Sequence, residues 1–413
     1  MKLWKTGKSE ELCAVILFKE DMQNSKTFLL IVLGILAAFG PFVTDMYLPG
    51  LPFMTSYFKT TASMVQLGIT TAMLGLAFGQ IIVGPLSDKY GRRTPLLFSL
   101  WLFFFATIGC IFSWNAEVFI VFRFIQGIAG AGGIVISRSV ATDCYSGKEL
   151  AKAFAMISAV NGLAPIIAPI VGGVMLKFTS WQGIFFALLL LGIVLLLLCY
   201  RLKESLPREN RIVTSAFSSF RAFLPLLVKR KFMGYVWVQS LILGVIFAYI
   251  SSSPFILQEH YQLSPLLYSF CFAGNAIALI MGTTWAGYFR SMQKGIWIGA
   301  GGSSLLSVIT ALTLWYEMPI LYFETALFFT LIFSGLVLPT STTLALDAER
   351  QKAGTASAVL GAAGFLVGGI VSPLVGLGNI LHSTAIVMII CSFLALGFVF
   401  TNSKVRKLNL QQV

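Results

Sequence analysis

Twelve apolar runs, each long enough to cross a lipid bilayer, constrain the fold of this chain more than any other feature. A helix needs roughly 20 apolar residues to span the hydrocarbon core, and a run such as 183–200 contains no charged residue. A transmembrane barrel would instead show ten-residue segments of alternating polarity. The sequence therefore predicts an all-α membrane protein with twelve transmembrane helices. The predicted spans are 27–54, 62–84, 94–113, 117–138, 149–176, 181–200, 231–256, 264–289, 295–316, 319–344, 353–377 and 381–401.

The composition excludes a water-soluble or disordered chain. Hydrophobic residues make up 57% of the sequence and charged residues 11%, whereas soluble domains carry about 25% charged residues. Polar side chains are too few to cover a surface in water, and apolar ones are too plentiful for disorder. A lipid bilayer is the surroundings that this composition fits.

The chain has a net charge of +13, and its basic residues are concentrated in every second loop. With both termini placed in the cytoplasm, 26 of the 29 Lys and Arg residues fall in cytoplasmic segments, and Lys59 and Lys177 fall outside. Basic residues in short loops orient a membrane protein in this way. Because the charge is spread over alternate loops, it does not form the single patch that binds nucleic acid. The remaining basic residue, Arg123, lies inside a predicted span.

A short internal repeat divides the chain into two halves. Residues 168–172 in the fifth span match 372–376 in the eleventh, and 84–86 match 287–290 at nearly the same offset. Such repeats are typical of transporters. The predicted domains are a cytoplasmic extension 1–26, a six-helix half 27–200, a basic cytoplasmic linker 201–230, a second six-helix half 231–401 and a cytoplasmic tail 402–413.

The N-terminal extension does not look like a signal peptide, because its apolar stretch 12–18 is only seven residues long and lacks a small-residue cleavage site. Met22 is an alternative start to Met1. The scattered cysteines and the two histidines, His260 and His382, form no cluster typical of a metal site or a catalytic centre. We therefore expect no enzyme activity, no metal and no cofactor.

A motif rich in glycine and charge, GPLSDKYGRRT, follows the second span at residues 84–94. Its glycines favour a tight turn, and its aspartate can pair with an arginine or lie at a helix N-terminus. Such a charge pair would latch the two halves together and break as they rock. The alternative is a solvated turn whose charges only orient the chain. The candidate latch residues are Gly84, Asp88, Gly91, Arg92, Arg93 and, from the fourth span's cytoplasmic end, Asp143, for which an ordinary surface position is the alternative.

Three ionisable residues, Asp45, Arg123 and Glu324, fall inside predicted spans, where such groups are costly and usually functional. At about 1.5 Å per helical residue, Asp45 and Arg123 lie at similar depths, so they can interact directly or through water. Gln126 is one turn from Arg123 and can hydrogen-bond either group. Glu324 is close to the start of its span, and we expect it to extend to the outer face.

Asp45 is the candidate proton-coupling carboxylate. Burial favours the neutral acid and a nearby arginine favours the carboxylate, so a balanced site can load a proton on one side and release it on the other. Arg123 and Gln126 would modulate it. The alternatives are that Asp45 only caps or kinks its helix beside Pro49, and that Arg123 only bridges backbone carbonyls.

These motifs resemble those of the major facilitator superfamily. Residues 84–94 resemble the signature between its second and third helices, and 123–127, RFIQG, resemble its RxxQG motif. Residues 168–173, APIVGG, are similar to the GPxxGG motif of its antiporters, with Ala168 in place of the first glycine. The segments 44–49, 253–255 and 275–276 resemble the Bcr/CflA branch of drug:proton antiporters. The resemblance covers about residues 27–400.

The resemblance implies a proton-coupled antiporter that exports small, mainly hydrophobic drugs across a bacterial inner membrane by alternating access. An exporter of an endogenous metabolite or siderophore with the same fold is the alternative. The implied partners are a small-molecule substrate, protons and the bilayer, for a protein that acts as a monomer. The motif residues Ala168, Pro169, Gly172 and Gly173 would pack helices closely, and the cavity candidates are Tyr47, Asn161, Tyr249 and Asn275.

Overall fold

The computed structural model describes residues 25–211, 224–349 and 353–411, and over these ranges it is helical without strands. Its long helices are α2 (Lys26–Asp45), α4 (Ala62–Tyr90), α5 (Arg93–Ile111), α6 (Ala116–Cys144), α7 (Gly147–Met175), α8 (Trp181–Tyr200), α11 (Arg230–Phe255), α12 (Pro265–Trp285), α13 (Met292–Trp315), α14 (Ile320–Ala348), α15 (Ala353–Leu374) and α16 (Ile380–Gln411). Short helices are η1 (Leu48–Gly50), α3 (Leu51–Phe58), η2 (Arg208–Asn210), α10 (Leu224–Leu227), η3 (Ile256–His260) and η4 (Ala286–Tyr288).

Twelve helical segments of the described chain are long and apolar enough to cross a bilayer, which confirms the twelve predicted spans. The first crossing runs from Lys26 to Phe58 but is interrupted after Asp45. Pro49 and Pro52 lie in the first positions of the short helices that follow, where a missing N–H costs nothing but also prevents continuation of the preceding helix. Asp45 is therefore the last residue of an α-helix that ends within the membrane.

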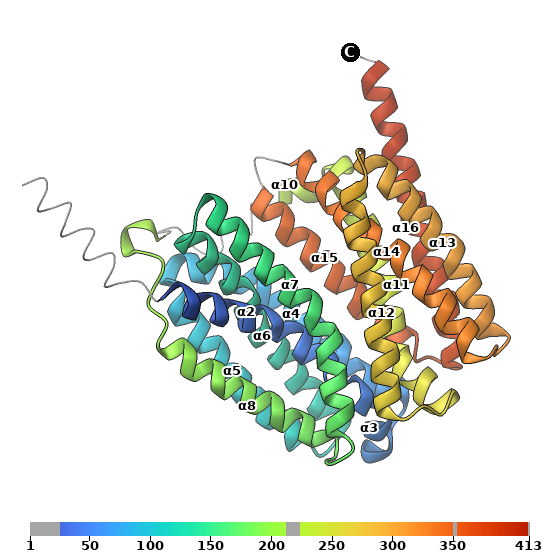
Figure 1. Cartoon of the computed structure of the whole chain (residues 1–413), viewed down its shortest axis with the longest axis horizontal. Helices are drawn as coiled ribbons and strands as arrows, with labels where there is room; N and C mark the ends of the chain where they lie inside the picture. The colour runs from blue at the N-terminus through green and yellow to red at the C-terminus, as the bar shows by residue number, and fades with distance from the viewer. Residues whose placement is uncertain (1–24, 212–223, 350–352, 412–413) are drawn as a thin grey trace, which may run out of the picture.

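Several helices extend beyond the predicted spans, and two of these extensions, in α4 and α16, change the interpretation of the sequence. α4 continues through Gly84 to Tyr90, so the motif turn begins only at Gly91. α16 continues to Gln411, so most of the predicted tail 402–413 is helical and extends beyond the bundle (Figure 1).

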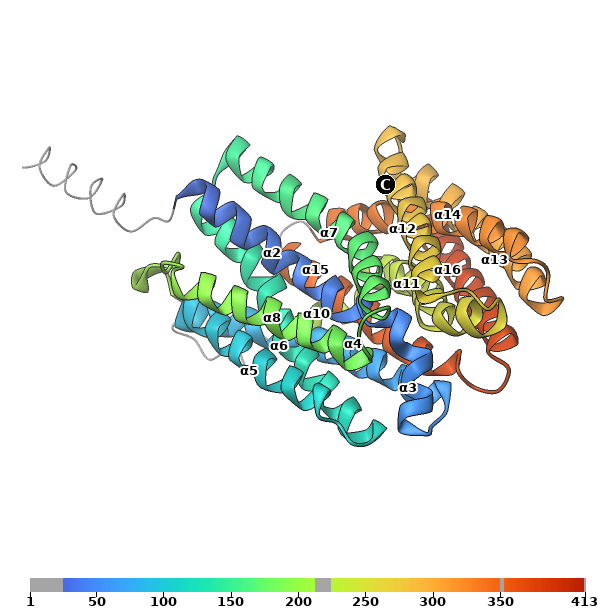
Figure 2. The same cartoon turned by 60° about the horizontal axis from the view of Figure 1, so that its bottom comes forward.

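The helices form two groups that follow the order of the chain (Figure 1). We call α2–α8 the first half and α11–α16 the second half; the segment 201–229 connects them. Two pairs of neighbouring helices, α4 with α15 and α7 with α12, form most of the boundary between the halves (Figure 2). Bulky apolar side chains such as Phe98, Phe105 and Leu197 point outward, as expected where lipid rather than water surrounds the helices.

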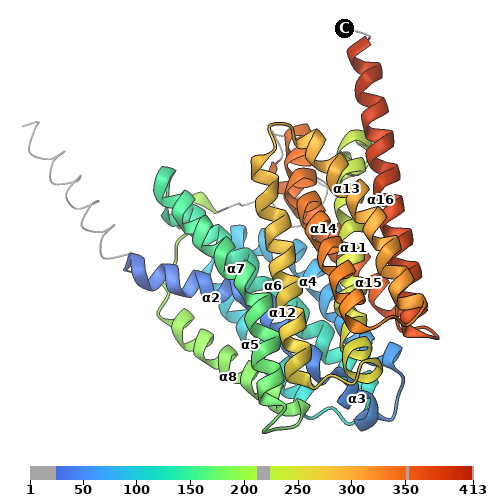
Figure 3. The same ribbon diagram turned by 45° about the vertical axis from the view of Figure 1, so that its right-hand side comes forward.

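The two halves meet at one end of the bundle and diverge at the other (Figure 3). We call the first the α3 end, since α3 lies there, and the second the linker end. Hydrogen bonds between the halves gather at the α3 end, and no ion pair between described residues joins the first half to the second. In each of these bonds a side chain donates to a main-chain oxygen. The bonds run from Gln66 Nε2 to Ser251 (2.9 Å), from Ser63 Oγ to Pro373 (3.2 Å), from Ser372 Oγ to Gln66 (3.4 Å), from Gln258 Nε2 to Pro49 (3.2 Å) and from Ser269 Oγ to Pro169 (2.7 Å).

Candidate functional site

A cavity of about 200 Å³ lies between the two halves and is lined almost entirely by apolar side chains. Residues of α2, α4, α6 and α7 face residues of α11, α12 and α15 across it. Asp45 is its acidic residue, and Thr44 and Tyr249 supply hydroxyl groups. The remaining lining residues are Gly40, Pro41, Met73, Leu76, Ile134, Pro165, Phe247, Ile250, Phe272, Ala276, Leu279 and Phe365.

Asp45 is buried at the wall of this cavity. Its Oδ1 accepts a hydrogen bond of 2.7 Å from Thr44 Oγ1. No ion pair of Asp45 occurs among the described residues. A buried carboxyl group without a basic partner favours its neutral, protonated form, so the position suits a group that gains and loses a proton.

Arg123 is completely buried inside the first half. Its guanidinium donates to two main-chain oxygens, from Nη2 to Val43 (3.0 Å) and from Nε to Gly68 (3.4 Å). Nη1 donates to the side chain of Gln126, whose own amide donates to Thr107 Oγ1 at 2.8 Å. A buried arginine needs acceptors for its donors, and the three acceptors of Arg123 come from α2, α4 and α6.

The structure thus brings Arg123 and Asp45 close without pairing them directly. Arg123 bonds the backbone of α2 two residues before Asp45, which is the contact that the backbone-bridging alternative predicts. Among the described residues, the hydrogen bonds of the Gln126 side chain go to Arg123 and Thr107 and not to Asp45. Arg123 therefore reaches the Asp45 region through the main chain of α2.

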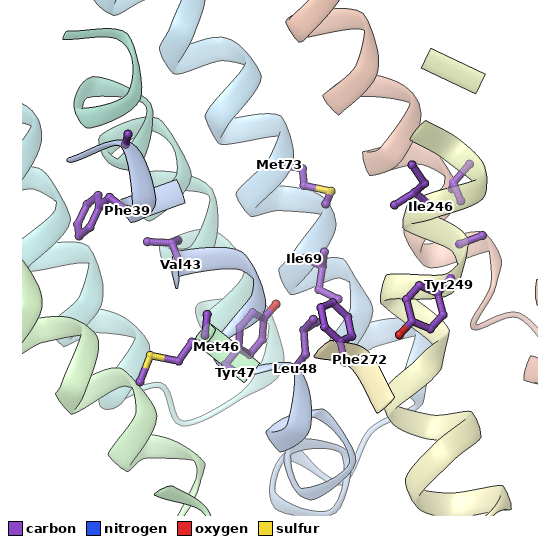
Figure 4. Close-up of a cluster of buried hydrophobic side chains, with 14 of the residues drawn as sticks. Phe39, Val43, Met46, Tyr47, Leu48, Ile69, Met73, Ile246, Tyr249 and Phe272 are labelled. Atoms are coloured by element: carbon purple, nitrogen blue, oxygen red, sulfur yellow. The ribbon is translucent and has the colours of Figure 1, made fainter. Parts of the chain in front are cut away.

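Tyr47 does not line the cavity, contrary to expectation. Its ring is fully buried, and the Arg123 guanidinium carbon lies 4.3 Å from the ring centre, within range of a cation–π interaction. Phe185 packs on it at a centroid distance of 5.6 Å. Figure 4 shows Tyr47 well apart from Tyr249, with Leu48 and Phe272 between them. The break after Asp45 turns this ring back into the first half.

The second half contributes a polar cluster that the sequence did not predict as a unit. Asn275 Nδ2 donates to the Tyr249 hydroxyl (3.0 Å) and to Glu324 Oε2 (2.8 Å). The expectation that Glu324 extends to the outer face is therefore wrong, because a buried amide holds its carboxylate inside the bundle. Tyr249 lines the cavity and Asn275 lies behind it. Asn161, half-buried on α7, is not among the lining residues.

The motif turn between α4 and α5 forms a network around Arg92, which is buried. Its guanidinium donates to Asp88 and to Ser87, and its Nε donates to Asp143 at 2.8 Å. Burial opposes the charge of Arg92, but the bonds to Asp143 and Asp88 outweigh it and raise the pKa of this side chain. The predicted neighbourhood of Asp88, Arg92 and Asp143 is confirmed.

Glu204, just after α8, completes this network and was missed from the sequence. Its carboxylate accepts from the backbone N–H groups of Arg92 (2.7 Å) and Arg93 (3.2 Å) at the start of α5, where helix N–H groups lack partners and anions are favoured. Ser205 also donates to Asp143. Every partner lies in the first half or in the adjoining linker, so in this conformation the network does not latch the two halves to each other.

The two glycines of the motif at 84–94, Gly84 and Gly91, differ in whether they form part of the turn. Gly91 has a φ of +90° and a Cβ there would overlap the Glu204 carboxylate, so the expected tight turn is confirmed at this position. Gly84 lies inside α4, and a Cβ added there would meet nothing within 4 Å. The expectation that Gly84 forms part of the turn is wrong.

The motif at 168–173 packs α7 against both halves at the α3 end. A Cβ on Gly172 would overlap the Met46 oxygen of the first half, and one on Gly173 would overlap Ser269 of the second half. Ala168 is fully buried, and the carbonyl of Pro169 accepts the hydroxyl of Ser269. The small residues therefore permit backbone contacts on two sides of one helix, which explains the pattern.

Comparisons with known proteins agree with this architecture. The family model described as Major Facilitator Superfamily matches residues 33–373. An uncharacterized MFS-type transporter of Bacillus subtilis is 38% identical over 354 residues, 84% of this chain and 88% of the relative. A bicyclomycin resistance protein homolog of Haemophilus influenzae is 28% identical over 367 residues, 86% and 90% of the two chains. The structure of a bacterial homolog of the human lysosomal transporter Spinster superposes with a TM-score of 0.72 at 15% identity, covering 92% of this chain and 98% of that one.

Proposed function

Because the chain belongs to the major facilitator superfamily, we propose that it is a proton-coupled antiporter that exports small, mainly hydrophobic compounds across the inner membrane of a bacterium. The observation that carries this proposal is the apolar cavity between the halves with the carboxyl group of Asp45 in its wall. An apolar pocket with few polar groups suits lipophilic ligands, and the buried acid supplies a proton site in contact with the same space.

The direction of export follows from the distribution of basic residues. On this proposal the linker end faces the cytoplasm, because the cytoplasmic segments carry most of the Lys and Arg residues. The halves then diverge toward the cytoplasm and are closed on the outside. A compound enters the cavity from this side, and rocking of the halves opens the α3 end for release.

In the proposed coupling step, a proton and the exported compound compete for the site at Asp45. A proton arriving from outside neutralises Asp45 when the α3 end is open. After the halves rock back, an incoming compound and the nearby charge of Arg123 favour the carboxylate, and the proton leaves to the cytoplasm. The similarity to a bicyclomycin resistance protein homolog supports a drug as the cargo.

Transport in everted membrane vesicles tests this proposal. A panel of drugs is added under an imposed pH gradient, and drug-driven proton release is followed with a fluorescent pH probe. Asp45→Asn keeps the size of the side chain and removes its exchangeable proton, so we expect it to lower the release strongly. Glu117→Gln, at an exposed acid of the same half, is the matched control and should behave as the wild type.

Two results would overturn parts of the proposal. Unchanged proton release in Asp45→Asn would remove Asp45 from the coupling step. If no drug dissipates the gradient, but a culture metabolite accumulates outside cells only when the protein is present, the cargo is an endogenous product.

A further inference from the structure

Glu324 is a second carboxyl group held inside the membrane, in the half that lacks Asp45. It lies near the start of α14, toward the α3 end. Its Oε2 accepts from Asn275, while Oε1 is buried and has no hydrogen-bond partner among the described residues. Asn275 in turn bonds the hydroxyl of Tyr249, which lines the cavity. The carboxyl group is thus separated from the cavity by one amide and one phenol.

No lysine or arginine neutralises Glu324 among the described residues. The titratable groups around it are the phenols of Tyr249 from α11, Tyr261 before α12 and Tyr268 from α12, the thiol of Cys271 from α12, and the exposed carboxyl group of Glu317 before α14. His260 packs on the ring of Tyr261. A buried carboxylate with neither a cation nor a full set of donors is unstable in a low-dielectric interior. A bound proton is the simplest partner for the free oxygen.

Two tyrosines near Glu324 place it within electrostatic range of the α3 end and of the region around Asp45. Burial, then the negative charges of Glu324 and Glu317, raise the pKa of Tyr261 in the loop at that end, which shows that Glu324 lies within electrostatic reach of the loop. Tyr268 is within electrostatic range of both Asp45 and Glu324. Each half thus contributes one buried acid to the surroundings of Tyr268, Asp45 from α2 and Glu324 from α14.

We propose that Glu324, held by Asn275 and Tyr249, is a second proton-binding site, so that each cycle carries one proton on Asp45 and one on Glu324. This inference rests on the proposed antiport function. A proton, unlike a drug molecule, can reach an acid that lies behind Tyr249 and Asn275. It binds when the α3 end is open and leaves when the cavity opens at the linker end, so no other reactant is needed.

Charge balance gives a direct test in proteoliposomes. The probe is tetraphenylphosphonium, a permanent lipophilic monocation, with transport driven separately by a pH gradient and by a membrane potential. Exchange of about two protons for one monocation moves one net charge, so wild-type transport should respond to both driving forces. Glu324→Gln should exchange about one proton and become electroneutral: transport driven by the pH gradient remains, and the response to membrane potential is lost. If tetraphenylphosphonium is not a substrate, neutral chloramphenicol serves, and the net charge moved should fall by half.

The controls separate this inference from the proposed function. Glu317→Gln removes an acid at the same end of the bundle and should keep the response to membrane potential, and Glu324→Asp should restore it. Glu324→Gln that stays sensitive to membrane potential would overturn the second site while leaving the antiport proposal intact. A wild-type protein that moves the probe without protons would overturn the antiport proposal itself.

A second measurement does not depend on the folding of Glu324→Gln. Infrared difference spectra of the purified protein, taken as the pH is raised, report the carbonyl band of protonated carboxyl groups. Asp45→Asn should retain one membrane-buried band that shifts in Asn275→Ala, because the amide bonds Glu324. Absence of any such band in Asp45→Asn would contradict the inference.

Discussion

Arg123 Nη2 donates a hydrogen bond of 3.0 Å to the main-chain oxygen of Val43. This bond ties the middle of α6 to the last turn of α2, immediately before the break at which Asp45 lies. The arginine of the RxxQG motif therefore holds the backbone of the helix that carries Asp45. We therefore expect the role of Arg123 to depend on the geometry of its donors as well as on its charge.

Arg123→Lys should be destabilised although the charge is kept. A lysine is a compact point charge and cannot reproduce the planar fork that serves Val43, Gly68 and Gln126. Each buried acceptor left without a donor costs about 1–3 kcal/mol. Thermal unfolding in detergent measures the effect, and Arg138→Lys, at an exposed position on the same helix, is the control. A melting temperature equal to that of wild type in both variants would show that charge alone matters at Arg123.

Gly172→Ala should prevent close contact between α7 and the end of α2, because the added methyl group would overlap the Met46 carbonyl. A backbone oxygen cannot move aside as a side chain can, so we expect a strong loss of folded protein. Gly84→Ala is the matched control within another motif: its methyl group meets nothing within 4 Å, and alanine favours a helix over glycine by about 1 kcal/mol. Size-exclusion profiles and unfolding temperatures compare the two. Equal stability of both variants would contradict the packing role of Gly172.

Glu204→Ala should destabilise the start of α5 by about 0.5–2 kcal/mol, the usual cost of removing a helix N-cap. The carboxylate accepts from two backbone N–H groups there, and Glu204→Gln, which keeps one oxygen acceptor, should lose less. The exposed Glu209 on the same linker provides the control as Glu209→Gln. Unfolding curves in detergent rank the variants, and a Glu204→Ala curve identical to that of Glu209→Gln would contradict the cap.

Gln66→Ala should shift the protein toward the conformation that is open at the α3 end. The side-chain amide of Gln66 donates to the main-chain oxygen of Ser251 in the other half, and this is the bond that alanine removes. The bond from Ser372 to the main-chain oxygen of Gln66 remains in the variant. No ion pair between described residues joins the halves at the linker end. Spin labels at the exposed positions Tyr57 and Leu267 report the separation of the halves. We expect a larger population of long distances in Gln66→Ala. A distribution unchanged from wild type would mean that apolar packing, not this bond, closes the α3 end.

The sequence alone determined the twelve spans, the division at the linker and the motif positions. Each of these follows from a local pattern: a run of about 20 apolar residues, a glycine with a neighbouring charge, or a charge inside an apolar run. The cost of placing Asp45 or Arg123 in lipid marks them without knowledge of their neighbours. The turn at Gly91 and the close packing at Gly172 were predictable because each glycine belongs to a local sequence motif.

Only the tertiary structure decided which side chains meet. In a membrane helix the side that faces lipid is as apolar as the side that faces the bundle, so hydropathy does not reveal how a helix is rotated about its axis. That rotation turns Glu324 toward Asn275 instead of the outer face and buries Tyr47 beside Arg123 instead of in the cavity. Glu204 reaches the start of α5 from more than a hundred residues away, a contact that no local pattern encodes.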